Sequence, residues 1–329
     1  MTDKMPRVIL TDSHSLGETD YSIEKKFFKE NGIEFIVENC KTDDELIEKC
    51  KDADGILTIY TKIHKGIIQK LCNCRVIVRY GIGYDNIDVD AATKKGIYVC
   101  NIPNYCVKEV ATHTIALILA IERKIAMFDR AVRKGIWDDS YGYPVHRLDG
   151  QVLGLVGFGS IARQTADYAK SFGFNIIACD PYLPEFVFKE MNVKKVELET
   201  LLRESDIISL HVPLNDDTRH LINSQTISKI KKTAIIVNTS RGPIIALDDL
   251  IDALKNNRIL AAGLDVLETE PLLGTDAEIL KLENVIITPH AAFNTVESIE
   301  ELHRKVAETA SKIIKGELPE NVVNKRLLT

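Results

Sequence analysis

A glycine motif directly after an apolar strand constrains the fold of this chain more than any other feature. The predicted strand Val152–Val156 leads at once into Gly157-Phe158-Gly159-Ser160-Ile161-Ala162. The first glycine permits a tight turn, the second lets the backbone approach a pyrophosphate, and the small third residue lets helix and strand pack closely. The N-terminus of the following helix carries a partial positive charge that favours a phosphate group. The motif therefore predicts the first β-α-β unit of a dinucleotide-binding sheet.

An acidic residue follows the second strand of the same unit. The strand predicted over Asn175–Cys179 ends at Asp180. A carboxylate at this place can accept hydrogen bonds from the adenosine ribose and repels a 2′-phosphate. A glycine pattern alone often marks only a tight turn. The strand, the glycines and the acid in this order favour NAD binding, and NAD over NADP.

The rest of the sequence alternates strands and helices in two series, which implies parallel sheets with helices on both faces. At 329 residues the chain has room for two such domains. The predicted strands of the first series are Val8–Leu10, Glu34–Val37, Gly55–Ile59, Val76–Val78 and Ile97–Val99. Those of the second series are Val152–Val156, Asn175–Cys179, Ile207–His211, Ala234–Asn238, Leu260–Val266 and Val285–Thr288.

Two longer helices are predicted outside these series. Val107–Arg123 is apolar nearly all round and is expected to be buried. Thr295–Lys315 is amphipathic, with Asn294 and Glu297 as a start that resembles a capping box, and with Gly316 as its stop.

Composition excludes several classes of function. The net charge of -6 argues against direct nucleic-acid binding, which needs a basic surface. The longest strongly apolar stretch, Ile115–Ile121, is far shorter than the roughly 20 residues of a membrane span. A strand that begins at Arg7 leaves no room for a signal peptide. Seven scattered cysteines, with only Cys72 and Cys74 close together, favour reduced thiols in a cytoplasmic protein over a zinc site.

Three polar residues of the second series follow strands of the same predicted sheet. Arg241 lies in Asn238-Thr239-Ser240-Arg241-Gly242, Glu270 precedes Pro271, and His290 follows Pro289. Taken alone they are more often a loop arginine, a surface acid and a structural histidine. Because parallel strands place their carboxyl ends at one edge of the sheet, all three are expected beside the cofactor. A planar guanidinium suits a carboxylate, and an imidazole with a carboxylate suits proton transfer.

These motifs together resemble the D-isomer-specific 2-hydroxyacid dehydrogenases over essentially the whole chain. The resemblance is closest to the branch of the C-terminal-binding-protein corepressors, with D-3-phosphoglycerate dehydrogenases as a second near group. The motifs that carry it are 79–88, Gly157–Ala162 with Asp180, Asn238–Gly242, Asp265 with Glu270-Pro271, and Thr288–Ala292.

The resemblance implies two doubly wound α/β domains. Residues 102–290 would be a Rossmann NAD-binding domain inserted in a flavodoxin-like substrate domain of residues 1–101 and 291–329. The active site would lie between them, and homodimers would form through the NAD domain. The catalytic residues would be Arg241, Glu270 and His290. Besides the glycine motif, Asp180, Arg241 and His290, the cofactor would contact Thr114, Val212, Pro213, Thr239, Ser240 and Asp265. Besides Arg241 and His290, the substrate would contact Arg79, Gly81, Ile82 and Phe293.

Three positions depart from the pattern of the family. Ser160 replaces a basic residue of the glycine loop, Ala162 replaces the third glycine, and Phe293 is where the corepressors carry a tryptophan. The predicted reaction is hydride transfer between NAD(H) and C2 of a small D-2-hydroxy or 2-oxo acid. The alternative is an NAD(H)-sensing corepressor-like binding protein. Two features count against it: Arg241, Glu270 and His290 are all present, and the chain lacks long disordered extensions. The motifs leave open which acid is the substrate and in which direction the reaction runs.

Overall fold

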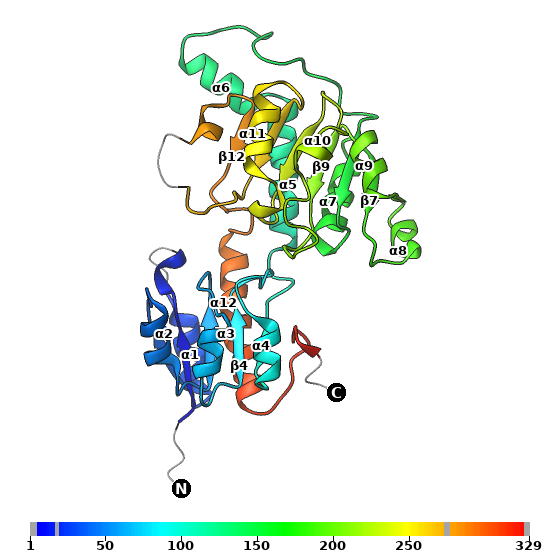
Figure 1. Ribbon diagram of the computed structural model, residues 1–329. Helices are drawn as coiled ribbons and strands as arrows, with labels where there is room; N and C mark the ends of the chain where they lie inside the picture. The colour runs from blue at the N-terminus through cyan, green and yellow to red at the C-terminus, as the bar shows by residue number, and fades with distance from the viewer. Residues whose placement is uncertain (1–4, 17–19, 273–276, 326–329) are drawn as a thin grey trace. The chain divides into compact units, whose positions relative to one another are not determined.

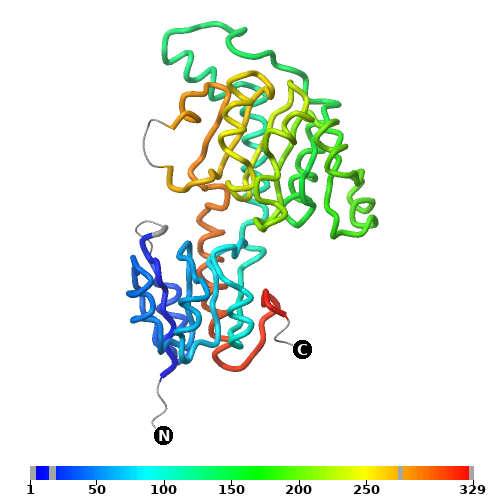
Figure 2. Tube along the Cα trace, in the orientation of Figure 1, coloured from blue at the N-terminus to red at the C-terminus, as the bar shows by residue number. Residues whose placement is uncertain are grey.

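Two parallel β-sheets form in separate units of the chain (Figure 1). The computed structural model describes residues 5–16, 20–272 and 277–325. The first unit comprises Met1–Tyr105 with Thr295–Thr329, and the second comprises Cys106–Asn294. Figure 2 shows that the blue beginning and the red end of the chain both belong to the first unit. The predicted α/β class with two parallel sheets is confirmed.

The sheet of the first unit has five strands in the order β2-β1-β3-β4-β5. Each strand pairs in parallel with its neighbours, as continuous runs of apolar residues predict for strands buried on both faces. The strands are β1 (Arg7–Leu10), β2 (Glu34–Val37), β3 (Gly55–Thr58), β4 (Val76–Arg79) and β5 (Tyr98–Cys100).

Helices cover both faces of this sheet. One face packs against α12 (Val296–Ile314), which also contacts α1 (Ser22–Glu30). The other face carries a core that includes Ile56 and Ile77 and is covered by α2 (Asp43–Cys50), α3 (Lys65–Lys70) and α4 (Val89–Lys94). A short 3-10 helix, Ser13–Leu16, follows β1.

The start of α12 differs from the prediction by one residue. Thr295, not Asn294, is the N-cap: its hydroxyl accepts the N–H of Ser298, and the Ser298 hydroxyl accepts the N–H of Thr295. The N–H of Asn294 donates to the carbonyl of Ala291, so Asn294 belongs to the preceding turn. Gly316 ends the helix as predicted, with φ of 83°.

The second sheet has seven parallel strands in the order β12-β11-β10-β9-β6-β7-β8. Its strand order reverses between β6 and β9, and ligands of such sheets bind where this reversal occurs, at the carboxyl ends of the strands. The strands are β6 (Val152–Val156), β7 (Asn175–Cys179), β8 (Lys194–Lys195), β9 (Ile207–Leu210), β10 (Ile235–Asn238), β11 (Ala261–Leu264) and β12 (Val285–Ile287).

Separate apolar cores lie on the two faces of this sheet. One contains side chains of α5 (Val107–Glu122) and α7 (Ser160–Lys170), so the apolar α5 is buried as predicted. The other contains side chains of α9 (Leu198–Glu204), α10 (Ser224–Ile227) and α11 (Leu247–Lys255). The remaining helices are α6 (Ile125–Arg133), α8 (Glu185–Glu190) and the 3-10 turns Gly242–Ile244 and Glu278–Lys281. Within the described ranges, no helix combines the length and apolarity of a membrane span.

Candidate active site

The turn after β6 has the backbone geometry that the glycine motif predicts. Gly157 has φ of 88°, and a Cβ there would lie 2.8 Å from the carbonyl oxygen of His211. Its N–H donates to the carbonyl of Cys179 at 2.8 Å, which fixes the turn beside β7. A Cβ on Gly159 would meet no atom within 4 Å. Open space therefore adjoins the N-terminus of α7, where Ser160 is exposed.

Asp180 lies against this turn. Its carboxylate accepts the N–H of Phe158 and the N–H of Tyr182, both at 3.0 Å. The Phe158 side chain points into the core instead, where its ring stacks on Phe188 at a centroid distance of 4.7 Å. Phe158 therefore contributes its backbone to the loop, while Ala162 is fully buried, as close packing of α7 requires.

These features fit a bound dinucleotide. The N-terminus of an 11-residue helix faces open space beside a glycine, and an acid lies at the end of the next strand. Val212 borders the turn, because its side chain would be 3.0 Å from a Cβ on Gly157. Pro213 follows it and accepts a hydrogen bond from Thr218 through its carbonyl.

The loop after β10 is held by hydrogen bonds at several points. Thr239 and the fully buried Thr114 of α5 are joined through their hydroxyls at 2.9 Å. The Ser240 hydroxyl donates to the carbonyl of Leu210, and its N–H donates to Oδ1 of Asn238. Thr114 thus acts on this region by fixing the loop to α5.

Arg241 follows in the same loop and is oriented by its backbone neighbours. Its carbonyl accepts from Nδ2 of Asn238, and its Nη1 donates to the carbonyl of Ser240 at 2.9 Å. A Cβ on Gly242 would be 1.8 Å from the carbonyl oxygen of Leu267. The arginine loop therefore packs directly on the segment that leads to Glu270.

Glu270 and His290 form the predicted acid–imidazole pair. Nδ1 of His290 lies 2.7 Å from Oε2 of Glu270, and Oε1 of Glu270 accepts the N–H of Leu267 at 2.9 Å. Burial opposes ionisation of Glu270, but the hydrogen bond and charge of His290, the Leu267 N–H and the charge of Arg241 outweigh it. The pKa of Glu270 is therefore lowered from its usual value. The side chains of His290 and Glu270 remain 21% and 33% exposed.

Asp265 organises the turn that carries His290. The turn holds His290 at φ of 53°, and its N–H donates to the carbonyl of Asp265 at 2.8 Å. The Asp265 carboxylate, 1% exposed, accepts the N–H groups of Ala291 and Ala292. Asp265, which is predicted to face the nicotinamide, thus binds the turn of His290 through its carboxylate.

His113 belongs to the same network and was not predicted. Its Nε2 lies 3.0 Å from the hydroxyl of Thr288 and 3.6 Å from Oδ1 of Asp265. The Thr288 hydroxyl donates to Oδ1 of Asp265 at 2.5 Å. A histidine in a largely buried helix, directly before Thr114, is the sequence signal that could have identified it. The ring of Phe293 lies edge-on to that of His290, with centroids 6.2 Å apart.

The predicted carboxylate-binding residues of the first unit also lie together. Gly81 has φ of 137°, and a Cβ there would be 1.6 Å from Nη1 of Arg79, so the guanidinium lies over this glycine. The Arg79 guanidinium is 5.9 Å from the centre of the Tyr60 ring. The carbonyl of Ile82 accepts from Nδ2 of Asn101 at 2.7 Å. Only a glycine at position 81 leaves room for this arrangement.

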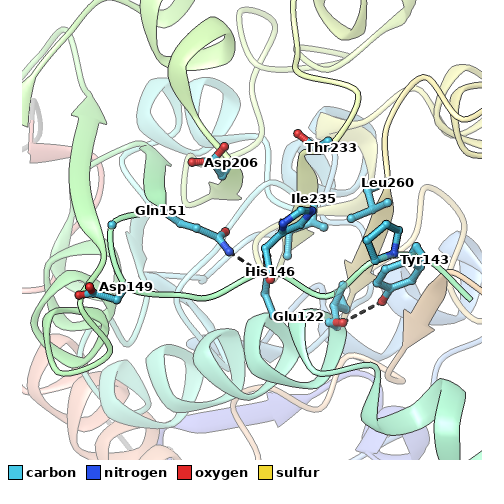
Figure 3. A pocket seen from close by; sticks show the side chains of 12 residues that line it. Glu122, Tyr143, His146, Asp149, Gln151, Asp206, Thr233, Ile235 and Leu260 are labelled. Carbon is cyan, nitrogen blue, oxygen red and sulfur yellow. Dashed lines mark hydrogen bonds between the residues drawn. The ribbon is translucent and has the colours of Figure 1, made fainter. Parts of the chain in front are cut away.

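A pocket of about 410 Å³ opens at the amino ends of the strands of the second sheet (Figure 3). Its lining includes Gln151, Asp206 and Leu260, each of which directly precedes a strand. Glu122, Tyr143 and His146 are grouped around it in Figure 3. Arg241, Glu270 and His290 follow the carboxyl ends of β10, β11 and β12, so this pocket lies at the opposite end of the strands from these three residues.

The cysteines form no disulfide and no metal site. All seven are free, and burial raises the pKa of Cys50 and that of Cys74 to about 12. Across the described ranges, no group of three or more histidine, cysteine or acidic side chains is arranged to hold a metal.

The glycine turn, the acid after β7 and three polar side chains after neighbouring strands define a Rossmann-type, NAD-dependent dehydrogenase. Residues 115–292 match the family described as D-isomer specific 2-hydroxyacid dehydrogenase, NAD binding domain. The chain belongs to this family, as its motifs predict.

Three relatives support the assignment. A glyoxylate reductase of Korarchaeum cryptofilum is 41% identical over 290 residues, which cover 86% of each chain. A D-3-phosphoglycerate dehydrogenase of Methanocaldococcus jannaschii is 44% identical over 285 residues, 86% of this chain but only 54% of that relative. The crystal structure of a glyoxylate reductase from Paecilomyes thermophila has a TM-score of 0.87 at 29% identity and covers 98% of this chain and 99% of its own.

These findings support the predicted oxidoreductase over the corepressor-like binding protein. The chain is an NAD-dependent enzyme of the 2-hydroxyacid dehydrogenase class. The closer placement in the corepressor branch stays a prediction.

Proposed function

We propose that this enzyme transfers a hydride between NAD(H) and C2 of a small 2-oxo or D-2-hydroxy acid, with Arg241, Glu270 and His290 as its catalytic residues. The observation that carries the proposal is the 2.7 Å contact between His290 and Glu270. It lies at the edge of the sheet where β10, β11 and β12 end. The same sheet bears the dinucleotide turn after β6.

His290 is the acid–base group in this mechanism. Bound NADH supplies the hydride. Because Nδ1 of His290 is engaged by Glu270, proton exchange with the substrate oxygen is assigned to Nε2. Glu270, with its lowered pKa, stays ionised and stabilises the protonated ring that reduction requires.

Arg241 orients the substrate. Its planar guanidinium can bind two carboxylate oxygens at once and places the carbonyl carbon for attack. The loop that carries it is fixed through Asn238 and Ser240, so the guanidinium starts from a defined position. Arg79, Gly81 and Ile82 of the first unit are proposed as further carboxylate-binding residues, supported by the guanidinium packed over Gly81. The first unit is accordingly proposed as the substrate domain and the second as the NAD-binding domain.

The proposed substrate class is a small, unphosphorylated 2-oxo acid such as glyoxylate. Two of the three relatives described above are named glyoxylate reductase. Phe293, whose ring lies edge-on to that of His290, is proposed as the wall that faces the substituent at C2. Neither candidate arginine lies in a larger basic cluster of the sequence that would suit a phosphate group.

We further propose a homodimer formed through the second unit. Apolar side chains of α6 and the segment after it are exposed, with Ile125 at 60%, Val132 at 48% and Trp137 at 89%. Exposed apolar residues gathered on one segment mark a protein interface. Light scattering should give the mass of a dimer, and Trp137→Ser should shift the protein toward monomer.

A cytoplasmic location is proposed as well, supported by seven free cysteines, since disulfides belong to oxidising compartments. Cell fractionation tests it.

The reaction itself is tested by NADH oxidation with glyoxylate, hydroxypyruvate, pyruvate, branched 2-oxo acids and phosphohydroxypyruvate. Turnover should be fastest with the small unphosphorylated acids. A clear preference for phosphohydroxypyruvate would overturn the proposed substrate class.

A further inference from the structure

Three buried polar side chains meet in the first unit where β4 ends. Glu24 of α1 is 0% exposed, and His303 of α12 and Tyr80 after β4 are each 2% exposed. The Tyr80 hydroxyl donates to Oε1 of Glu24 at 2.8 Å, and Nδ1 of His303 lies 2.5 Å from the same oxygen. None of the three has a part in the chemistry proposed above.

Tyr80 links this cluster to the segment of residues 79–83, named here the carboxylate loop. The backbone of the loop is held where the N–H of Tyr80 donates to the carbonyl of Thr58 and the N–H of Ile102 donates to that of Gly81. The Tyr80 side chain reaches between two helices, because it bonds Glu24 of α1 and meets the His303 ring of α12 edge-on at 5.7 Å. Its sequence neighbours Arg79 and Gly81 are the residues proposed to bind the substrate carboxylate.

The hydroxyl of Tyr80 acts as a donor. Burial, together with the charge of Glu24, raises the pKa of Tyr80 well above its usual value, so the hydroxyl keeps its proton. Within the described part of the chain, Oε2 of Glu24 and both ring nitrogens of His303 have no hydrogen-bond partner, so the 2.5 Å contact at Nδ1 lacks hydrogen-bond geometry. The hydrogen bond from the Tyr80 hydroxyl is therefore what orients the Glu24 carboxylate. A buried pair of this kind adds little net stability, because desolvation offsets the attraction.

We infer that Glu24 and His303 are positioning residues of the carboxylate loop, acting through the hydroxyl of Tyr80. Glu24 fixes the Tyr80 side chain and with it the backbone on either side. His303 lies with Nδ1 against the Glu24 carboxylate and packs edge-on against the Tyr80 ring. The inference rests on the proposed role of the loop in binding the substrate carboxylate.

Tyr80→Phe is the direct test, because it removes one hydroxyl and keeps the ring. The KM for glyoxylate should rise about tenfold, the effect of losing one hydrogen bond to a charged group. The kcat and the KM for NADH should stay near those of the wild type.

Tyr21→Phe is the matched control. Tyr21 is 4% exposed and packs on the same His303 ring at 5.6 Å, but its hydroxyl donates to the carbonyl of Ser13. Tyr21→Phe removes a similarly buried hydroxyl from the cluster without touching the Tyr80–Glu24 hydrogen bond, so the KM for glyoxylate should not change.

Two further variants separate the partners. Glu24→Gln keeps an oxygen that can accept from Tyr80, so its KM should lie between those of the wild type and Tyr80→Phe. His303→Phe keeps a ring but removes the contact at Nδ1, and it should raise the KM as well. A lowered melting temperature with an unchanged KM in both would mean that the pair only supports the fold.

Hydrogen–deuterium exchange gives a readout that does not depend on turnover. Amides of residues 79–83 should exchange faster in Tyr80→Phe than in the wild type, and at the wild-type rate in Tyr21→Phe. If the wild type reduces no 2-oxo acid, the proposed function fails, but the exchange rates still decide whether the cluster holds the loop. Equal exchange in Tyr80→Phe and Tyr21→Phe would overturn the inference.

Discussion

Replacing Glu270 with glutamine removes the charge beside His290 and keeps the size of the side chain. At the observed 2.7 Å, the attraction between a carboxylate and an imidazolium is about 1.5 kcal/mol at the dielectric constant of water. A hydrogen bond to a charged group contributes roughly 1.5–3 kcal/mol. Because both side chains are partly exposed, we use these modest values, and about 1.5–3 kcal/mol corresponds to a roughly ten- to hundredfold change in rate.

The expected result is a loss of activity together with a changed acid limb of the pH profile. Reduction needs the protonated ring that Glu270 stabilises, so kcat/KM for glyoxylate at neutral pH should fall roughly ten- to hundredfold in Glu270→Gln. The acid limb depends on Glu270 itself. The pKa of Glu270 is lowered, so the pair persists above its ordinary value of 4.5 and is lost only as pH falls through the lowered value. An acid limb caused by Glu270 should therefore lie below pH 4.5 and be absent from the variant.

Glu268→Gln is the matched control for this experiment. Glu268 lies two residues away and contacts a different imidazole, that of His220, at 2.5 Å. Glu268→Gln makes the same change in net charge without touching His290, so the pH profile of this variant should match that of the wild type. If Glu270→Gln leaves kcat/KM for glyoxylate unchanged, or if both variants lower it equally, the proposed coupling between Glu270 and His290 is wrong.

Three further substitutions follow from the same geometry. Arg241→Lys keeps a charge but loses the planar fork, so kcat and substrate affinity should both fall while NADH binding, measured by fluorescence, is retained; unchanged turnover would remove Arg241 from the site. Asp180→Ala removes the carboxylate at the glycine turn and should lower the preference for NAD over NADP about tenfold, measured as the ratio of the two kcat/KM values. An unaltered ratio would mean that Asp180 does not set the cofactor preference. His113→Leu removes a ring bonded to Thr288 and should lower kcat while the KM for NADH changes little. A lower melting temperature with an unchanged kcat would make His113 a structural residue.

The sheets could be predicted from the sequence because parallel strands are buried on both faces and read as unbroken apolar runs. β8 has only two residues, Lys194 and Lys195, and carries no such signal. The helix α6 was missed for a different reason, because its start carries no capping signal. Lys124, its N-cap, has a left-handed backbone and makes no side-chain capping bond. The start of α12 was placed wrongly because Asn294 and Thr295 are both good capping residues, and only the turn that Asn294 closes decides between them.

The candidate site was predictable as far as strand order determines it. Arg241, Glu270 and His290 follow neighbouring strands, so they had to meet at one edge. Which acid pairs with His290 is decided by the turn after β11. There the N–H of Leu267 bonds Glu270, whereas Glu268 bonds the N–H of Leu247. The network of His113, Thr288 and Asp265 joins residues far apart in sequence, so the sequence could mark His113 as a polar residue of a buried helix but not the residues that it contacts.

The most direct measurement of the central claim is NADH oxidation by the purified protein with glyoxylate, for the wild type and for His290→Ala. The wild type should oxidise NADH only when the 2-oxo acid is present and should form the D-2-hydroxy acid when hydroxypyruvate or pyruvate is supplied. His290→Ala should still bind NADH measurably and lose nearly all turnover in both directions. Undiminished turnover in His290→Ala, or a wild type that binds NADH but reduces none of these acids, would contradict the account.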